Sequence, residues 1–144
     1  MKLWQKNPKL IKEVEEFLSG EDILFDEKLI KYDCLASMAH VKMLHKINVL
    51  DSSEKQQLLE ELQNIIEMHG QGLFKIKPGE EDCHTTIENH LTRKLGKVGK
   101  KIHTARSRND QVLTALRLFY KDELQICKKQ IMELINALKN FVAK

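Results

Sequence analysis

The stretch that decides the fold is SRNDQVLTALRLFYKDELQICKKQIMELINALKNFVAK, residues 107–144. Apolar side chains recur in it at every third or fourth position: Leu113, Leu116, Tyr120, Leu124, Cys127, Ile131, Leu134, Leu138 and Phe141. This spacing places them on one side of a helix, as in the seam of a helical bundle or a coiled coil. At about 1.5 Å per residue the helix would extend roughly 50 Å, whereas a compact chain of this size has a radius of gyration of only about 15 Å. We therefore expect the helix to overhang its own domain and to bury this seam against a partner.

The long helix runs to Lys144 without a glycine, a proline or another signal for a helix end. This pattern predicts that the natural chain continues beyond Lys144 and that the sequence has been cut there. A self-contained dimer, formed by pairing two copies of the helix along the seam, is the alternative interpretation.

The rest of the chain also has the pattern of helices. It holds only two prolines and six glycines, and the alternation of apolar and polar residues that is typical of strands is nowhere sustained. Further helices are predicted at residues 8–19, 26–47, 51–69 and from Glu80 to a stop before Gly96. The third begins at a capping box formed by Asp51 and Glu54. Beside the apolar stripe of the second lies a polar strip, formed by Asp33, Ser37 and His40. The predicted fold class is all-α.

Composition narrows the possible classes of protein. With 144 residues, 42% hydrophobic and 31% charged, the chain has the size and content of one soluble globular domain. The 24 Lys and Arg are nearly balanced by 21 Asp and Glu, so the net charge of +3 does not by itself indicate a nucleic-acid partner. No stretch approaches the roughly 18 consecutive apolar residues of a membrane span, and residues 1–8 lack the apolar core of a signal peptide. We expect a cytoplasmic protein with no membrane partner.

No metal site and no cofactor are predicted. The three cysteines, Cys34, Cys83 and Cys127, are far apart and follow no metal-ligand spacing. We interpret them as reduced packing residues of a cytosolic protein. His84 and Glu88, four residues apart in a predicted helix, could supply two metal ligands, but no third ligand accompanies them. An ion pair along the helix is the better interpretation of these two side chains.

A dense polar run, KIHTARSRNDQ at residues 101–111, leads into the long helix. Its position at the helix start would expose free backbone N–H groups and the positive end of the helix dipole to the same volume as Arg106 and Arg108. Ser107 and Asn109 would add directed hydrogen-bond donors. The run therefore predicts a small-anion site.

Two other interpretations of this run compete with the anion site. Residues 97–108 carry five basic residues and no acidic one, as a phosphate-binding loop for nucleic acid would, but they contain no aromatic residue for base stacking. A plain helix cap explains Ser107 or Asn109, but it does not explain the arginines on either side of Ser107. We therefore favour a small anion and expect no nucleic-acid partner.

Residues 103–111, HTARSRNDQ, resemble the first signature of the argininosuccinate lyase family, which belongs to the fumarase and aspartase superfamily. The resemblance extends over essentially the whole chain, in matching order and spacing, at Leu3-Trp4, residues 25–33, Ala39-His40, Met43-Leu44 and residues 81–88. Sibling enzymes usually lack the two arginines that flank Ser107. The resemblance implies two parts of the superfamily's fold. Residues 1–106 would form an N-terminal helical domain that carries the signature loop (residues 103–111). Residues 107–144 would form the truncated start of the first long helix of a central helical bundle.

The resemblance also implies a reaction. An argininosuccinate lyase eliminates arginine reversibly from argininosuccinate and leaves fumarate, as a step of arginine biosynthesis. The family's substrate-binding positions correspond here to Ser107, Arg108 and Asn109, and its supporting positions to Asp82, His84, His103, Thr104, Arg106 and Asp110. No catalytic residue is expected in this chain, because the family's later Gly-Tyr-Thr-His-like and Gly-Ser-Ser-x-Met-Pro-like segments do not occur in it.

Active sites of the family form where three subunits of a homotetramer meet, and each subunit gives one motif. The chain is therefore expected to bind argininosuccinate, arginine and fumarate, to associate with further subunits through the long helix, and to be inactive alone. The rival hypothesis is a helical binding or oligomerisation module without catalysis, whose basic loop binds anions or nucleic acid.

Two departures from the family pattern carry expectations of their own. Ala105 stands where the family most often has glycine, so a positive φ at this position would be strained. The start of the chain, Leu3-Trp4-Gln5-Lys6, replaces the more common Leu-Trp-Gly-Gly-Arg-Phe, and no binding role is assigned before Asp22.

Overall fold

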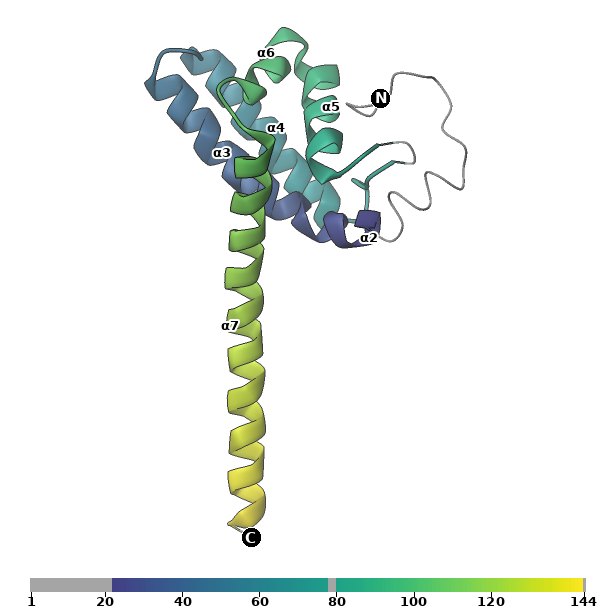
Figure 1. Cartoon of the computed structure of the whole chain (residues 1–144), viewed down its shortest axis with the longest axis vertical. Coiled ribbons are helices and arrows are strands. Elements are labelled where there is room, and N and C mark those ends of the chain that lie inside the picture. The colour runs from purple at the N-terminus through teal and green to yellow at the C-terminus, as the bar shows by residue number, and fades with distance from the viewer. Residues whose placement is uncertain (1–21, 78–79, 144) are drawn as a thin grey trace.

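The computed structural model describes residues 22–77 and 80–143, which form a head of short helices and one long projecting helix, α7 (Figure 1). In chain order the elements are α2 (Asp22–Asp26), η1 (Glu27–Leu29), α3 (Ile30–Lys46), α4 (Ser52–Gly70), α5 (Cys83–Leu95), α6 (Lys97–Lys100), η2 (Lys101–His103) and α7 (Arg108–Val142). Every regular element among the described residues is helical, which confirms the all-α prediction. The helix predicted at residues 8–19, like the divergent start of the chain, lies outside the described residues.

Helix α3 is the centre of the head, because it packs against α4, α5 and α7. The predicted apolar stripes form the core there, and its fully buried side chains include Ile30, Cys34, Val41, Leu44, Leu58, Leu62, Ile65 and Leu91. Each buried Leu or Ile contributes about 1.5–3 kcal/mol relative to an exposed one. Ile47, the last residue of the helix predicted at 26–47, is an exception with 52% of its surface exposed, because α3 ends one residue earlier, at Lys46.

Local signals explain where α4 and α5 begin. The predicted capping box is confirmed, since Asp51 Oδ1 accepts a hydrogen bond from the backbone N–H of Glu54 at 2.8 Å and Glu54 Oε2 accepts one from Asp51 at 3.1 Å. Helix α5 begins later than predicted, at Cys83, because Asp82 is its N-cap and accepts from the backbone N–H of Thr85 at 2.6 Å. The second predicted helix also starts later, at Ile30, after the tighter turn η1.

The connection between α5 and α7 contains two short helical turns, α6 and η2, in a stretch for which the sequence predicted no helix. Gly96 reverses the chain after α5 with a φ of 59°. Gly99 then brings α6 against the backbone of α5, where a β-carbon would come within 2.2 Å of the Leu91 carbonyl oxygen. The two glycines therefore make this compact connection possible.

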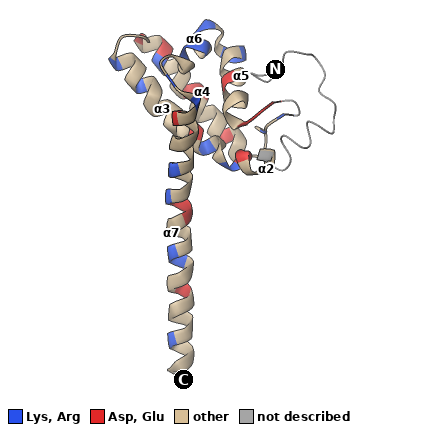
Figure 2. Ribbon diagram, in the orientation of Figure 1, with Lys and Arg blue, Asp and Glu red and all other residues tan. Residues whose placement is uncertain are grey.

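Helix α7 contacts the head through its N-terminal part, as far as Asp122, which accepts a hydrogen bond from Tyr32 of α3 at 3.2 Å. Gln111 and Ala115 are buried, and Leu116 and Phe119 pack against the core. Residues 120–143 are all exposed, and Figure 2 shows both signs of charge along this part of the helix. The predicted overhang is confirmed (Figure 1), and much of the seam is exposed. Within the described residues, no helix is long and apolar enough to cross a membrane.

The cysteines differ in environment. Cys34 and Cys83 are buried in the core, and burial raises the pKa of both thiols, so they are protonated and unreactive. Their predicted packing role agrees with this placement. Cys127 lies exposed on α7 and packs against nothing in the head.

Candidate functional site at the start of α7

The signature loop connects η2 to α7 and is held by the polar strip of α3. Members of this strip are four and three residues apart, which places them on one side of the helix. His40 Nε2 lies 3.0 Å from the carbonyl oxygen of Thr104, and Ser37 Oγ accepts a hydrogen bond from Arg106 Nη1 at 2.8 Å. The polar strip therefore fixes both the backbone and a side chain of the loop.

Asp33, the first member of the strip, is fully buried and contacts side chains from two other helices and the loop. Gln111 Nε2 of α7 donates hydrogen bonds to Oδ1 at 3.1 Å and to Oδ2 at 3.0 Å. Arg106 Nη2 donates to Oδ1 at 3.4 Å. His84 Nδ1 of α5 lies 3.0 Å from Oδ2 without hydrogen-bond alignment. A buried carboxylate is costly unless partners compensate its charge, and the partners of Asp33 come from α5, α7 and the loop. Asp33 therefore joins these elements to α3.

The guanidinium of Arg106 is committed to this buried network. Its side chain is only 8% exposed. Burial lowers the pKa of Arg106, and the negative charges of Asp33 and Glu88 oppose that shift. The guanidinium stays charged, as arginine does in proteins. The sequence predicts Arg106 and Arg108 around the same anion, but the structure directs the charge of Arg106 to Asp33 instead.

Ala105 lies between the two residues that the polar strip holds. Its neighbours Thr104 and Arg106 are bound by His40 and Ser37, and its own φ is 54°. A side chain with a β-carbon rarely adopts this left-handed conformation, which costs of order 1 kcal/mol or more. The strain predicted for a positive φ at Ala105 is therefore present.

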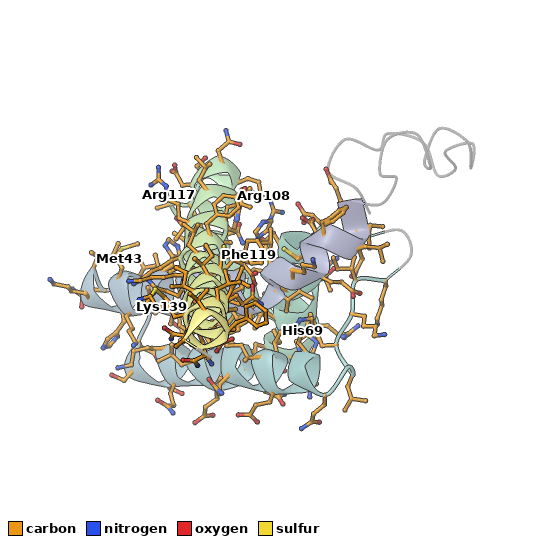
Figure 3. The ribbon with its side chains drawn as sticks, turned by 90° about the horizontal axis from the view of Figure 1, so that it is seen from below. Met43, His69, Arg108, Arg117, Phe119 and Lys139 are labelled. Atoms are coloured by element: carbon orange, nitrogen blue, oxygen red, sulfur yellow. The ribbon has the colours of Figure 1, made fainter. Side chains whose placement is uncertain are left out.

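Arg108, the first residue of α7, is half-buried beside α5. Its Nη1 donates to Glu88 Oε1 at 3.2 Å and to Gln111 Oε1 at 3.3 Å. Its Nη2 donates to Thr85 Oγ1 at 3.3 Å. Figure 3, which looks along α7, places Arg108 and Arg117 on different sides of that helix. Arg108 is thus the arginine of the loop that keeps part of its surface, 24% of the side chain, open to a ligand.

The predicted ion pair between His84 and Glu88 is wrong. His84 is 2% exposed and turns inward to Asp33, whereas the partly exposed Glu88 turns to the loop, where its Oε1 lies 3.3 Å from His103 Nδ1 and 3.2 Å from Arg108 Nη1. Each side chain therefore meets residues of other elements on its own side of α5. Spacing along one helix could not reveal these partners from other elements.

Ser107, Asn109 and Asp110 are exposed at the start of α7. Ser107 is the N-cap of α7, but its hydroxyl makes no capping hydrogen bond, and the first backbone N–H groups of a helix have no partner within it. A cavity of about 380 Å³ adjoins this surface, and its lining includes Ala36, Ala39, His40, Met43, Ser107 and Asp110. Of the predicted binding residues, Ser107 lines this cavity, whereas Arg108 and Asn109 do not. Free N–H groups and the positive end of the dipole at the start of a helix favour an anion.

Two other predicted supporting residues have local roles. Asp82 caps α5 by accepting a hydrogen bond from the backbone N–H of Thr85. The side chain of Asp110 is exposed, while its carbonyl oxygen accepts a hydrogen bond from Thr114 at 2.7 Å. Within the described residues, no group of three or more His, Cys, Asp and Glu is arranged to hold a metal ion.

Sequence reasoning missed several side chains that build the site: Asp33, Ser37, Thr85, Glu88 and Gln111. The sequence holds one signal for two of them, because Asp33 and Ser37 belong to the polar strip beside the apolar stripe of α3. Polar groups on a helix face next to the core need buried partners, and the basic loop carries the matching donors.

Comparison with known proteins places this geometry in a family. Residues 4–142 match the model of a family described as lyase. The chain belongs to this lyase family. Its relatives include the argininosuccinate lyase of Thermotoga neapolitana, 50% identical over 143 residues, which are 99% of this chain and 36% of the relative. The resemblance predicted from the signature loop is thereby confirmed.

Other relatives in the family agree. The argininosuccinate lyase of Phocaeicola vulgatus is 47% identical over 137 residues, 95% of this chain and 31% of the relative. That of Xanthomonas oryzae pv. oryzae is 43% identical over 124 residues, 85% of this chain and 29% of the relative. The chain thus spans about a third of the length of the curated lyases that it matches.

Proposed function

We propose that this chain supplies the substrate-carboxylate contacts of an argininosuccinate lyase, which converts argininosuccinate reversibly to arginine and fumarate in arginine biosynthesis. The observation that carries the proposal is the segment at the start of α7 in which the half-buried Arg108 lies between the exposed Ser107 and Asn109. It belongs to a chain that is 50% identical to an argininosuccinate lyase over 99% of its length. Ser107, Arg108 and Asn109 bind the succinate part of the substrate, and the loop residues His103, Thr104, Arg106 and Asp110 support them.

The arrangement suits the charge that the reaction develops. Removal of a proton next to a carboxylate produces a carbanion whose negative charge spreads onto that carboxylate. Hydrogen-bond donors and a guanidinium that are already in place stabilise this charge as it forms. Arg108 contributes a planar pair of donors, Ser107 and Asn109 contribute side-chain donors, and the N-terminus of α7 contributes its dipole.

The chemistry also needs groups that move protons. The segments that supply them in the family do not occur in the 144 residues, so the chain is inactive alone. The exposed seam of α7 supports self-association, since Leu124, Leu134 and Leu138 are each more than half exposed and such apolar surface favours a partner. We propose that the complete active site forms between subunits of a cytoplasmic homotetramer.

Titration of the isotope-labelled chain with succinate and with argininosuccinate, followed by NMR, tests the binding proposal. Saturable shifts confined to Ser107, Arg108, Asn109 and their neighbours would support it, and no shift with either ligand would refute it.

Fumarate release, measured by ultraviolet absorbance, should equal that of a matched blank. Turnover that appears on mixing with the later segments of a related lyase would support the composite site. Salt-sensitive binding to RNA or DNA, with no effect of argininosuccinate on melting, would favour a non-catalytic binding module.

A further inference from the structure

We infer that Asp33 is a positioning residue for the ligand-binding segment of the signature loop: its single buried carboxylate binds Arg106 and Gln111, the residues at either end of that segment. The inference rests on the proposed function, in which Ser107, Arg108 and Asn109 contact a carboxylate of the substrate. Asp33 itself is fully buried and does not touch the ligand.

The first step of the argument is the position of the two bonds along the chain. Arg106 precedes the exposed segment and Gln111 follows it, and both donate to Asp33, at 3.4 Å and at 3.0–3.1 Å. Four residues, 107–110, lie between them. A loop whose ends are tied to one point has few conformations left, so its donors keep their positions before a ligand arrives.

The second step is the backbone of the loop itself. Residue 105 adopts a φ of 54° between Thr104, held by His40, and Arg106, held by Ser37 and Asp33. An alanine released from such tethers would return to negative φ and change the direction of the chain that enters α7. The polar strip therefore maintains a loop geometry that the local sequence does not favour.

The third step concerns charge. Asp33 contacts two basic side chains, Arg106 and His84, and keeps them on the buried side of the loop. Arg108 then remains as the half-exposed guanidinium of the segment. Asp33 thereby determines which of the two arginines meets the ligand, and preorganisation of this kind lowers the free-energy cost of binding.

The test compares Asp33→Asn with Asp122→Asn in the whole chain. Asp122 makes the other polar link between α3 and α7, as it accepts a hydrogen bond from Tyr32 at 3.2 Å, but it lies well along α7 from the signature loop. Hydrogen exchange reports the loop directly through the amides of Thr104, Arg106 and Gln111, which donate to Lys101, His103 and Ser107. The amides of α4 report the stability of the head.

Asp33→Asn should accelerate hydrogen exchange at the three loop amides by about tenfold or more, while the exchange rates of the α4 amides change by less than about twofold. Asp122→Asn should leave the loop amides unchanged. Equal acceleration of the loop and α4, or no acceleration of the loop, would overturn the inference. If Asp33→Asn does not fold, Gln111→Leu removes one of the two side chains that Asp33 binds, and the same comparison applies to it at the amides of Thr104 and Arg106.

Ligand binding supplies a second readout. Succinate, titrated by NMR, should bind about fivefold or more weakly to Asp33→Asn and within about twofold of the original affinity to Asp122→Asn. Unchanged affinity in Asp33→Asn, together with a loosened loop, would contradict a positioning role. If neither succinate nor argininosuccinate binds the unaltered chain, the proposed function fails, while the exchange experiment still decides whether Asp33 fixes the loop.

Discussion

Gly99 lies directly against the backbone of Leu91, so that a β-carbon on Gly99 would come within 2.2 Å of the Leu91 carbonyl oxygen. Rotation of a side chain cannot relieve this clash, because the atoms that the β-carbon would meet belong to the backbone of α5. Gly99→Ala should lower the free energy of unfolding by about 2 kcal/mol or more, since overpacking of this kind forces backbone shifts. Urea denaturation, followed by circular dichroism, measures the loss.

Gly70→Ala is the matched control for this substitution. Gly70 ends α4, and a β-carbon there would meet nothing within 4 Å. The change should alter stability by less than about 1 kcal/mol, in the stabilising direction if the last turn is well formed. A comparable loss of stability in both variants would show that the close approach of α6 to α5 is not what requires Gly99.

The capping box at the start of α4 gives a second prediction. Asp51→Ala removes the acceptor for the backbone N–H of Glu54 and should cost about 1 kcal/mol of unfolding free energy, the usual effect of losing an N-cap. Asp51→Asn keeps a side-chain oxygen at the same position and should retain most of the stability. Thermal unfolding of the two variants measures the difference, and equal losses in both would contradict a capping role.

His40 predicts a pH dependence at the signature loop. Burial lowers the pKa of His40, and the nearby charges of Arg106 and His103 lower it further, against the opposing effect of its hydrogen bond to Thr104. The folded chain therefore binds a proton here less readily than the unfolded chain, whose histidine titrates near pH ~6.5. The contribution to stability is complete above that pH and is lost as the pH falls through the unfolded pKa toward the lower folded pKa.

Comparison with His40→Gln isolates this effect, because an amide can still donate to the Thr104 carbonyl. Between about pH 7 and pH 5, the unaltered chain should lose more stability than the variant. Urea midpoints measured at several pH values provide the comparison. Parallel curves for the two proteins would contradict the prediction.

Much of the fold could be predicted from the sequence, because its periodic signals are local. The apolar stripes of α3, α4 and α7 and the Asp51 capping box depend on neighbours within a few residues. The turns α6 and η2 were missed because no apolar period can develop over such short elements. Their conformation depends on the contact between Gly99 and Leu91, which lie in different helices.

The candidate site was predictable only in its exposed part. The order of residues 103–111 indicated the polar residues at the start of α7, and the family resemblance indicated the strained position of Ala105. The inner half depends on long-range pairs, such as Arg106 with Asp33, 73 residues apart. Two arginines separated by one serine look equivalent in a sequence, and only packing against α3 distinguishes the buried Arg106 from the half-exposed Arg108.

The exposed seam of α7 gives a prediction about association. Leu134 lies on the seam with 60% of its surface exposed, whereas Asn136 lies two residues further on, toward the opposite side of the helix. Leu134→Lys should weaken self-association by about tenfold or more, because it places a charge where an apolar contact forms. Asn136→Lys adds the same charge outside the seam and should have little effect. Sedimentation over a range of concentrations tests both variants, and equal weakening would mean that net charge, not the seam, controls assembly.

The last prediction concerns Arg108, the half-exposed guanidinium of the signature loop. Its planar group donates to Glu88, Gln111 and Thr85 in the free chain and should turn one edge to a carboxylate ligand. Arg108→Lys keeps the charge but removes the paired donors, so succinate should bind about tenfold more weakly. Arg117→Lys, an exposed position on another side of α7 (Figure 3), should leave the affinity unchanged. Because both substitutions preserve net charge, an equal loss in the two variants would exclude directed recognition by Arg108.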